Sequence, residues 1–230
     1  MKLKSLGELS VIKTIYKGAE AVIYLAYFNG EMVIVKKRIP KPYRHRELDR
    51  IIRLRRMLHE ARMLHYVKRL GIHTPTLIDI DLKEYAIIME YIPGVTLKEH
   101  LLSSRELDSK RIGLLRELGK IMGILHENNI MHGDPTIANV IVLGNELILV
   151  DLGLSKNTSD IEDHGTDMHL LLRILESTFG HMGELMFKHV LEGYASIRGS
   201  DTAMNILRKI YDIRSRGRYV KFRGKSVWQL

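Results

Sequence analysis

Apolar and polar side chains alternate along the first 92 residues in the way that is typical of β-strands. Val, Ile and Tyr, which favour strands, are concentrated in the same segments. Asn29 and Gly30 form a two-residue hairpin signal between two of them, and Pro93 with Gly94 indicates a hinge after the last. The pattern therefore predicts five strands, at residues 9–17, 21–28, 31–38, 77–82 and 85–91.

Helical spacing replaces this alternation in one segment of the first part and in most of the remainder. Apolar residues recur every three to four positions between Leu48 and Val67, and Gly71 is a typical helix stop. Asp108 is a favourable N-cap for a long helix. Beyond Gly94 the pattern predicts helices at residues 97–102, 108–128, 165–179, 182–196 and 202–214, and short strands at residues 140–143 and 146–150.

This order of elements predicts an α+β protein with the bilobal fold of protein kinases. Residues 1–92 would form a strand-rich N-lobe, a five-stranded antiparallel sheet with one main helix. Residues 93–213 would form a truncated helical C-lobe, and residues 214–230 a basic C-terminal tail.

Composition narrows the class of protein. With 45% hydrophobic residues over 230 positions, the chain can bury a full core. It has no cysteine, which excludes disulfides, thiolate catalysis and cysteine-ligated metal sites. No apolar run approaches the length of a transmembrane helix, and no signal peptide opens the sequence. We therefore expect a cytoplasmic protein with no membrane partner.

The net charge of +9 indicates a polyanionic partner, with a solvated basic surface as the simpler alternative. Between Lys36 and Arg69, basic residues far outnumber the acidic Glu47, Asp49 and Glu60. The tail has no acidic residue and carries Arg214, Arg216, Arg218, Lys221, Arg223 and Lys225. Two basic clusters in one chain favour contact with nucleic acid.

Residues 132–139 match the catalytic loop of protein kinases, H-R-D-x-x-x-x-N, with Gly133 in the second position. In this interpretation Asp134 accepts the proton of the attacking hydroxyl, and the amide oxygen of Asn139 holds a metal ion. Asp151 follows in an Asp-Leu-Gly sequence where kinases carry D-F-G, and would be the principal metal ligand. Each motif alone also occurs in ordinary loops, but their order and spacing favour a phosphotransferase. Oxygen ligands of this kind suit Mg²⁺ or Mn²⁺.

A cation for the nucleotide phosphates is expected at Lys36, which ends the third strand where kinases carry V-A-I-K. The two-residue period of a strand puts Ile34 and Lys36 on one face and Lys37 on the other. Glu60, in the central part of the following helix, is the expected ion-pair partner of Lys36. The structural alternative is that the lysines merely end an edge strand and that Glu60 is solvated.

Backbone positions complete the predicted ATP site. Met89 would be the gatekeeper at the end of the fifth strand, and the backbone of Glu90 and Ile92 would bind the adenine edge. Gly18 and Ala19, between the first two strands, would cover the phosphates, although this loop has one glycine where G-x-G-x-x-G has three. These assignments depend on position, because backbone contacts leave no side-chain signature.

With these residues assembled, the sequence resembles the PRPK-type kinase subunit of the KEOPS complex, in its small stand-alone archaeal form. The resemblance covers nearly the whole chain. It is carried by residues 18–21, 35–41, 43–45, 60–62, 132–134, Thr136, Asn139 and 151–153. It implies an ATP- and Mg²⁺-dependent serine/threonine kinase that autophosphorylates, an ATPase, or both, acting in the threonylcarbamoyl modification of adenosine in tRNA. The implied partners are the threonylcarbamoyl-transferase subunit, other KEOPS subunits, and tRNA, held by the basic tail and the basic N-lobe surface.

Two features depart from ordinary protein kinases. No A-P-E motif precedes the next helix, so a peptide-docking platform would be absent. Thr136 stands where many serine/threonine kinases place a lysine near the γ-phosphate. Both indicate weak peptide phosphorylation and leave protein or water as the acceptor. Asp167, in the helix after the short loop, would either hold the catalytic-loop backbone or be an exposed helical side chain.

Other functions are compatible with parts of this pattern. RIO-type kinases and small-molecule phosphotransferases share the truncated lobe, but the run from Lys36 to His45 disfavours them. A pseudokinase-like scaffold that binds RNA and proteins is the alternative of a different class. The set of five functional residues favours an enzyme, because a pure scaffold has no need of Lys36, Glu60, Asp134, Asn139 and Asp151 together.

Overall fold

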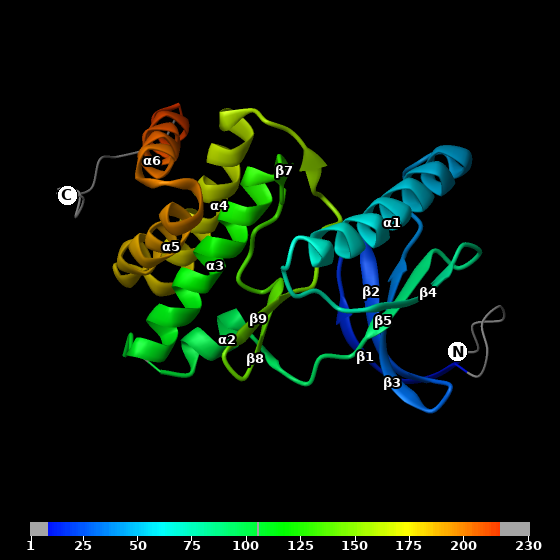
Figure 1. Cartoon of the computed structure of the whole chain (residues 1–230). Helices are drawn as coiled ribbons and strands as arrows, with labels where there is room; N and C mark the ends of the chain where they lie inside the picture. The colour runs from blue at the N-terminus through cyan, green and yellow to red at the C-terminus, as the bar shows by residue number, and fades with distance from the viewer. Residues whose placement is uncertain (1–8, 105, 217–230) are drawn as a thin grey trace. The chain divides into compact units, whose positions relative to one another are not determined.

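The computed structural model describes residues 9–104 and 106–216, which form two compact units (Figure 1). Unit 1 comprises residues 9–94 and 148–154, and unit 2 comprises residues 95–147 and 155–216. The sequence placed residues 148–154 in the helical lobe, because they follow its strands along the chain. They pack with unit 1 instead: Leu152 is fully buried, and the amide of Leu149 donates to the carbonyl of His73 at 2.9 Å.

Unit 1 is an antiparallel sheet with one long helix, as predicted. Asn29 and Gly30 both have positive φ, 50° and 88°, which is the geometry that a two-residue hairpin turn requires. The strands lie in the spatial order β1 (Leu9–Lys17), β2 (Ala21–Phe28), β3 (Glu31–Arg38), β5 (Ala86–Glu90) and β4 (Leu77–Asp81).

The two faces of this sheet are built by alternate residues of β3 and β5. Val33 and Val35 pack with Ile88 in a core cluster on one face. On the other face, Ile87 and Met89 pack against the helix α1 (Arg46–Arg69). Because Ile34 lies on this second face, the two-residue period brings Lys36 to the side of the sheet that α1 covers.

Unit 2 is mainly helical (Figure 1). Helices α3 (Ser109–Glu127) and α5 (Met182–Arg198) approach closely at two glycines. A Cβ on Gly119 would lie 1.9 Å from the carbonyl oxygen of Val190, and one on Gly193 would lie 1.8 Å from that of Arg116. The side chains of Phe187 and Tyr194 are fully buried in the core of this unit. Its other elements are β6 (Val95–Thr96), α2 (Leu97–Leu102), β7 (Ile130–Met131), β8 (Val140–Leu143), β10 (Lys156–Asn157), α4 (Ile161–Phe179) and α6 (Ser200–Ser215). Strand β9 (Glu146–Leu149) begins in unit 2, and its last two residues belong to unit 1.

Element boundaries in unit 2 differ from the prediction by up to four residues. Helix α4 begins four residues early, because the side chain of Asp160 accepts a hydrogen bond from the amide of Glu162 and caps it. Helix α6 continues to Ser215, so Arg214, where the predicted helix ended and the predicted tail began, is helical and forms an ion pair of 2.9 Å with Glu176. The remaining tail, residues 217–230, lies outside the described residues.

The hydrophobic segments of the described chain belong to ordinary packed helices and strands. No helix within residues 9–104 and 106–216 combines the length and the apolar character needed to cross a membrane.

Candidate functional site

The expected ion pair between Lys36 and Glu60 is present in unit 1. Lys36 Nζ lies 2.5 Å from Glu60 Oε1, and the side chain of Glu60 is completely buried. Strand β3 supplies the lysine and the middle of α1 supplies the glutamate. The alternatives of a lysine on an open edge strand and a solvated glutamate are therefore wrong. Lys37 points the other way, as predicted, and pairs with Glu84 at 2.5 Å.

A second cation, which the sequence did not single out, shares the same carboxylate. Arg38 Nη2 lies 2.6 Å from Glu60 Oε2, and Arg38 is 6% exposed. The signal for it was available, because Arg38 is two residues beyond Lys36 and therefore lies on the same face of β3. One buried carboxylate thus holds two cations, one on each oxygen, and charge-assisted hydrogen bonds of this kind are strong.

Asp151 completes this group in unit 1. Its Oδ2 lies 2.8 Å from Lys36 Nζ, and its Oδ1 accepts a hydrogen bond from the amide of Gly153 at 2.9 Å. A Cβ on Gly153 would lie 2.9 Å from Arg38 Nη2, so glycine at this position leaves room for the arginine. Lys36 is therefore held between two carboxylates from distant parts of the chain.

These contacts set the protonation of the cluster. Burial lowers the pKa of Lys36, but the carboxylates of Glu60 and Asp151 outweigh this effect and raise it above its usual value. Burial raises the pKa of Glu60, while Lys36 and Arg38 oppose that rise. Lys36 is thus a cation at neutral pH.

The predicted catalytic loop lies in unit 2. The side-chain amide of Asn139 donates to the backbone carbonyl and to Oδ2 of Asp134, both at 3.1 Å. The amide of Thr136 donates to the same carbonyl at 2.7 Å. Gly133 has a φ of +83°, a conformation that disfavours side chains with a Cβ, which explains glycine in the second position of the motif. Asp134 and Asn139 are therefore adjacent, and both are partly exposed.

Asp167 of α4 accepts hydrogen bonds from the backbone of this loop. Its Oδ2 accepts from the amide of His132 at 2.5 Å, and its Oδ1 accepts from the amide of Gly133 at 2.9 Å. Asp167 is completely buried, so the alternative of an exposed helical side chain is wrong. The residue fixes the backbone that carries Asp134.

Buried aromatic side chains support Asp167. The Nε2 atom of His126 lies 3.2 Å from Asp167 Oδ2, and its Nδ1 lies 3.0 Å from the hydroxyl of Tyr194. The rings of His126 and His164 stack with centroids 4.2 Å apart. Burial lowers the pKa of His126, and it lowers that of His164 to about 4. Both imidazoles are therefore neutral at pH 7, and the sequence pattern contained no periodic signal for this cluster.

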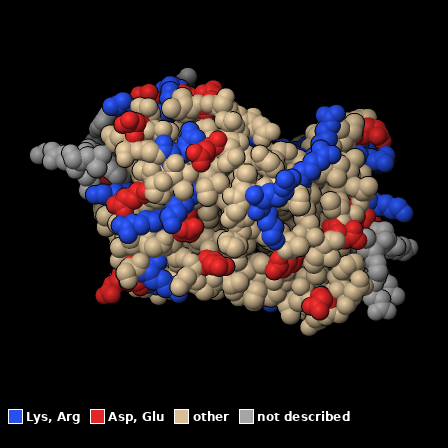
Figure 2. Space-filling view, viewed as in Figure 1, with Lys and Arg blue, Asp and Glu red and all other residues tan. Residues whose placement is uncertain are grey.

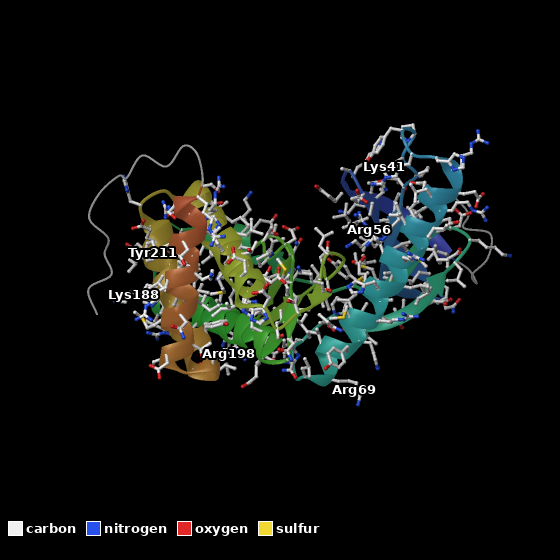
Figure 3. The ribbon with its side chains drawn as sticks, turned by 90° about the horizontal axis from the view of Figure 1, so that it is seen from above. Lys41, Arg56, Arg69, Lys188, Arg198 and Tyr211 are labelled. Carbon is white, nitrogen blue, oxygen red and sulfur yellow. The ribbon has the colours of Figure 1, made fainter. Side chains whose placement is uncertain are left out.

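The predicted phosphate-covering loop forms a tight turn between β1 and β2. The amide of Gly18 donates to the carbonyl of Ala21 at 2.9 Å. The carbonyl of Ala19 accepts from Lys41 Nζ. Glu20 forms an ion pair of 2.8 Å with Arg56, and Figure 3 labels Arg56 and Lys41 on the same part of unit 1. These basic side chains restrain the loop without a glycine-rich sequence.

The predicted hinge residues follow one another at the end of β5. Met89 is buried beside Met57 and Ala61 and is part of the core. The amide of Glu90 donates to the carbonyl of Thr76 at 2.9 Å. An adenine contact at Glu90 would therefore have to use its carbonyl. The carbonyl of Ile92 accepts from the amide of Gly94 at 2.9 Å, which makes a turn where unit 1 ends.

The sequence predicts Asp151 and Asn139 as ligands of a metal ion. The described residues contain no group of three or more His, Asp or Glu side chains that could hold a metal by themselves. They do contain carboxylate and amide oxygens in Asp151 and Asn139. Mg²⁺ commonly takes one or two protein carboxylates and completes its coordination with water and substrate phosphates. Each of these two residues therefore carries an oxygen ligand of the kind that suits Mg²⁺ better than zinc.

A lysine–glutamate pair in a β-rich unit, an Asp-Leu-Gly segment and an Asp–Asn loop on a helical unit define the class of protein kinases. Comparison with known proteins agrees: residues 9–175 match the family described as protein tyrosine and serine/threonine kinase. The Rio2 kinase of Chaetomium thermophilum, solved as an ADP/Mg²⁺-phosphoaspartate complex, has a similar fold, with a TM-score of 0.59 and 16% identity over 90% of this chain and 70% of that one.

Sequence relatives are more specific. The chain is 43% identical to the KEOPS complex subunit Bud32 of Pyrococcus abyssi, over 90% of this chain and 96% of that protein. It is 35% identical to the corresponding subunit of Dictyostelium discoideum, over 94% and 86% of the two chains. The chain therefore belongs to the Bud32 family of protein kinases, which confirms the resemblance seen in the sequence.

A third relative is a longer protein. The chain is 38% identical to a probable bifunctional tRNA threonylcarbamoyladenosine biosynthesis protein of Methanothermobacter thermautotrophicus, over 88% of this chain and 36% of that protein. The chain thus spans about a third of the length of this relative.

Proposed function

We propose that this protein transfers the γ-phosphoryl group of ATP, as a serine/threonine kinase that autophosphorylates, as an ATPase, or as both. The observation that carries the proposal is Lys36 held by the buried Glu60 and by Asp151. A lysine positioned between these two carboxylates is the arrangement that protein kinases use to bind nucleotide phosphates.

In this proposal each residue has one task. Lys36 binds phosphate oxygens, Glu60 orients Lys36, and Asp151 and Asn139 hold Mg²⁺, or Mn²⁺ in its place. When bound, the metal neutralises charge on the transferring phosphoryl group. Asp134 accepts the proton of the attacking hydroxyl or water. Gly18 and Ala19 cover the phosphates, and Met89, Glu90 and Ile92 form the adenine side.

The length of one segment favours poor peptide phosphorylation. Only residues 154–160 separate the Asp-Leu-Gly segment from α4, which begins at Ile161. Protein kinases bind peptide substrates on an activation segment that ends in A-P-E, and this segment has no room for one. Water, or a serine or threonine of this chain or of a bound partner, is therefore the proposed acceptor.

Partners are proposed from the relatives. Two relatives are named as KEOPS complex subunits, and another is a single longer protein of tRNA threonylcarbamoyladenosine biosynthesis. Because a homologous region is joined to further sequence in that protein, we propose that this chain acts beside a threonylcarbamoyl-transferase subunit. We further propose that tRNA contacts the basic tail and the basic surface of unit 1.

ATP turnover with Mg²⁺ tests the enzymatic proposal. Asp134→Ala and Asp151→Ala should each lower turnover at least about 100-fold, which corresponds to about 2.7 kcal/mol. Asp212→Ala, which removes an exposed carboxylate from α6, is the matched control and should leave turnover unchanged. Following the label of [γ-³²P]ATP separates phosphate on protein from phosphate in solution, with and without the partner subunit and tRNA. Unchanged turnover in both active-site variants would make the protein a scaffold.

A further inference from the structure

Two groups stand out among the basic residues of unit 1. In the first group each cation pairs with a carboxylate of the same unit; for example, Arg53 lies 2.7 Å from the buried Asp49. Carboxylates already offset the charges of these residues, so they are poor candidates for contact with an RNA backbone. The paired cations are Lys36, Lys37, Arg38, Arg44, Arg50, Arg53 and Arg56.

The second group forms a row on α1. Arg55, Arg62 and Arg69 are all exposed. None of the three forms an ion pair with another described residue. They are spaced seven residues apart, so two helical turns return each one to nearly the same face. With a rise of 1.5 Å per residue, successive members lie about 10 Å apart and the row spans about 21 Å. Figure 2 shows basic side chains following this helix, and Figure 3 labels Arg69 at its end.

No acidic side chain interrupts this face. Between Arg50 and Arg69 the sequence has one acidic residue, Glu60, and it is buried on the opposite side of the helix. The exposed His65 and the half-exposed Tyr66 add groups that can stack on bases or donate hydrogen bonds. The outer face of α1 therefore carries three solvated cations in a line, without the carboxylates that would neutralise them.

We propose that this row, Arg55, Arg62 and Arg69, holds the phosphate backbone of a structured RNA. Guanidinium groups bind phosphate oxygens in pairs of hydrogen bonds, and binding releases the counterions of the RNA. A line of cations matches a polymer with a charge on every residue better than it matches the scattered carboxylates of a folded protein. The proposal rests on the proposed function in tRNA modification, and it assigns the RNA contact of unit 1 to one helix face.

The test measures how the affinity for RNA depends on salt. The probe is a fluorescein-labelled, unmodified tRNA transcript, and binding to the full chain is followed by anisotropy between 50 and 200 mM KCl. Each phosphate contact contributes about 0.9 to the slope of log K against log salt. The triple variant R55Q/R62Q/R69Q should therefore lower the magnitude of this slope by about 2 to 3. Glutamine keeps a high helix propensity, and thermal unfolding checks the fold.

A matched control separates the row from net charge. The variant K110Q/R173Q/R208Q removes three exposed cations from unit 2 and changes the charge by the same amount. Its slope should stay within about 1 of the unmodified protein's. Equal losses in the two triple variants, an unchanged slope in the α1 variant, or no RNA binding by the unmodified protein would each overturn the proposal. Competition by poly-L-glutamate as effective as that by tRNA would overturn it in favour of an acidic polypeptide.

ATP turnover of the unmodified protein, measured without RNA, tests the proposed function separately. A protein that turns over ATP but shows an unchanged salt slope in the α1 variant would refute the RNA row and keep the phosphotransferase. A protein whose α1 variant shows the expected change in slope, but which does not turn over ATP, would refute the phosphotransferase and keep the RNA row.

Discussion

Replacing Arg38 with methionine removes one of the two cations that share the buried Glu60, while keeping an unbranched side chain in its place. In the unmodified protein Arg38 Nη2 lies 2.6 Å from Glu60 Oε2, and Lys36 Nζ lies 2.5 Å from Oε1. In the variant, Lys36 alone neutralises the carboxylate. We expect the free energy of unfolding to fall, because one oxygen of a fully buried carboxylate loses its charged partner.

The size of the effect follows from this geometry. Removing one partner of a buried ion pair costs about 3–5 kcal/mol, because the other charge stays buried. Since Lys36 still contacts Glu60, we expect the lower end of that range, about 3 kcal/mol at pH 7. Loss of Arg38 also removes one of the two cations that oppose the raised pKa of Glu60. In the folded variant the pKa of Glu60 is therefore higher than in the unmodified protein, and the stability deficit of the variant shrinks as the pH falls toward 5.

Urea unfolding followed by far-UV circular dichroism at pH 5, 6 and 7 measures both quantities. Arg46→Met is the matched control, because Arg46 is exposed at the first position of α1, where a cation faces the positive end of the helix dipole. Its free energy of unfolding should change by less than about 0.5 kcal/mol. A loss below about 1 kcal/mol for Arg38→Met at pH 7, or a deficit that is constant between pH 5 and 7, would refute the two-cation account of Glu60.

Three further predictions concern unit 2. Asp167→Asn places an amide donor where the backbone amides of His132 and Gly133 now donate, which loosens the catalytic loop. ATP turnover should therefore fall at least about tenfold. An unaltered rate would show that other contacts hold the loop. Gly193→Ala puts a Cβ 1.8 Å from the Arg116 carbonyl oxygen and should lower the free energy of unfolding by about 3 kcal/mol. Gly113→Ala has open space around it and should raise the free energy of unfolding by up to about 1 kcal/mol. Thermal unfolding compares the pair, and equal shifts would contradict the close approach of α3 and α5. Burial lowers the pKa of His164 from 6.5 to about 4, so the unfolded chain is protonated first as the pH falls. The free energy of unfolding should therefore fall as the pH drops from 6.5 toward 4. In His164→Gln this loss should be smaller, and an identical pH profile would exclude His164 as its source.

Much of the architecture could be predicted from local patterns. The strands over residues 9–17, 21–28 and 31–38 have the predicted bounds, and so does the helix over residues 97–102. The partner of Lys36 was also predictable, because the kinase motif requires a glutamate on the next helix and the central part of that helix contains one. The pairing is seen in the structure, while the catalytic roles of Lys36 and Glu60 stay predictions that the turnover assays address.

Contacts between distant segments could not be predicted in the same way. Arg38 has the strand period to reach Glu60, but nothing in the pattern says that one carboxylate has room for two cations. Likewise, the three short strands β6, β7 and β10 have two residues each, which is too short for periodicity to register. Their existence depends on hydrogen bonds to partners far along the chain.

The amino-acid sequence by itself determined the kinds and order of the elements, the kinase class and the spacing of Asp134, Asn139 and Asp151, because periodicity, turn residues and motif spacing are properties of neighbouring positions. Only the tertiary structure decided that Asp167 is buried behind the catalytic loop and that residues 148–154 belong with unit 1. It also decided which arginines of α1 are neutralised and which are solvated. The physical reason is that burial and ion pairing depend on which distant surfaces the fold brings together, and a carboxylate removed from water must find its cation there.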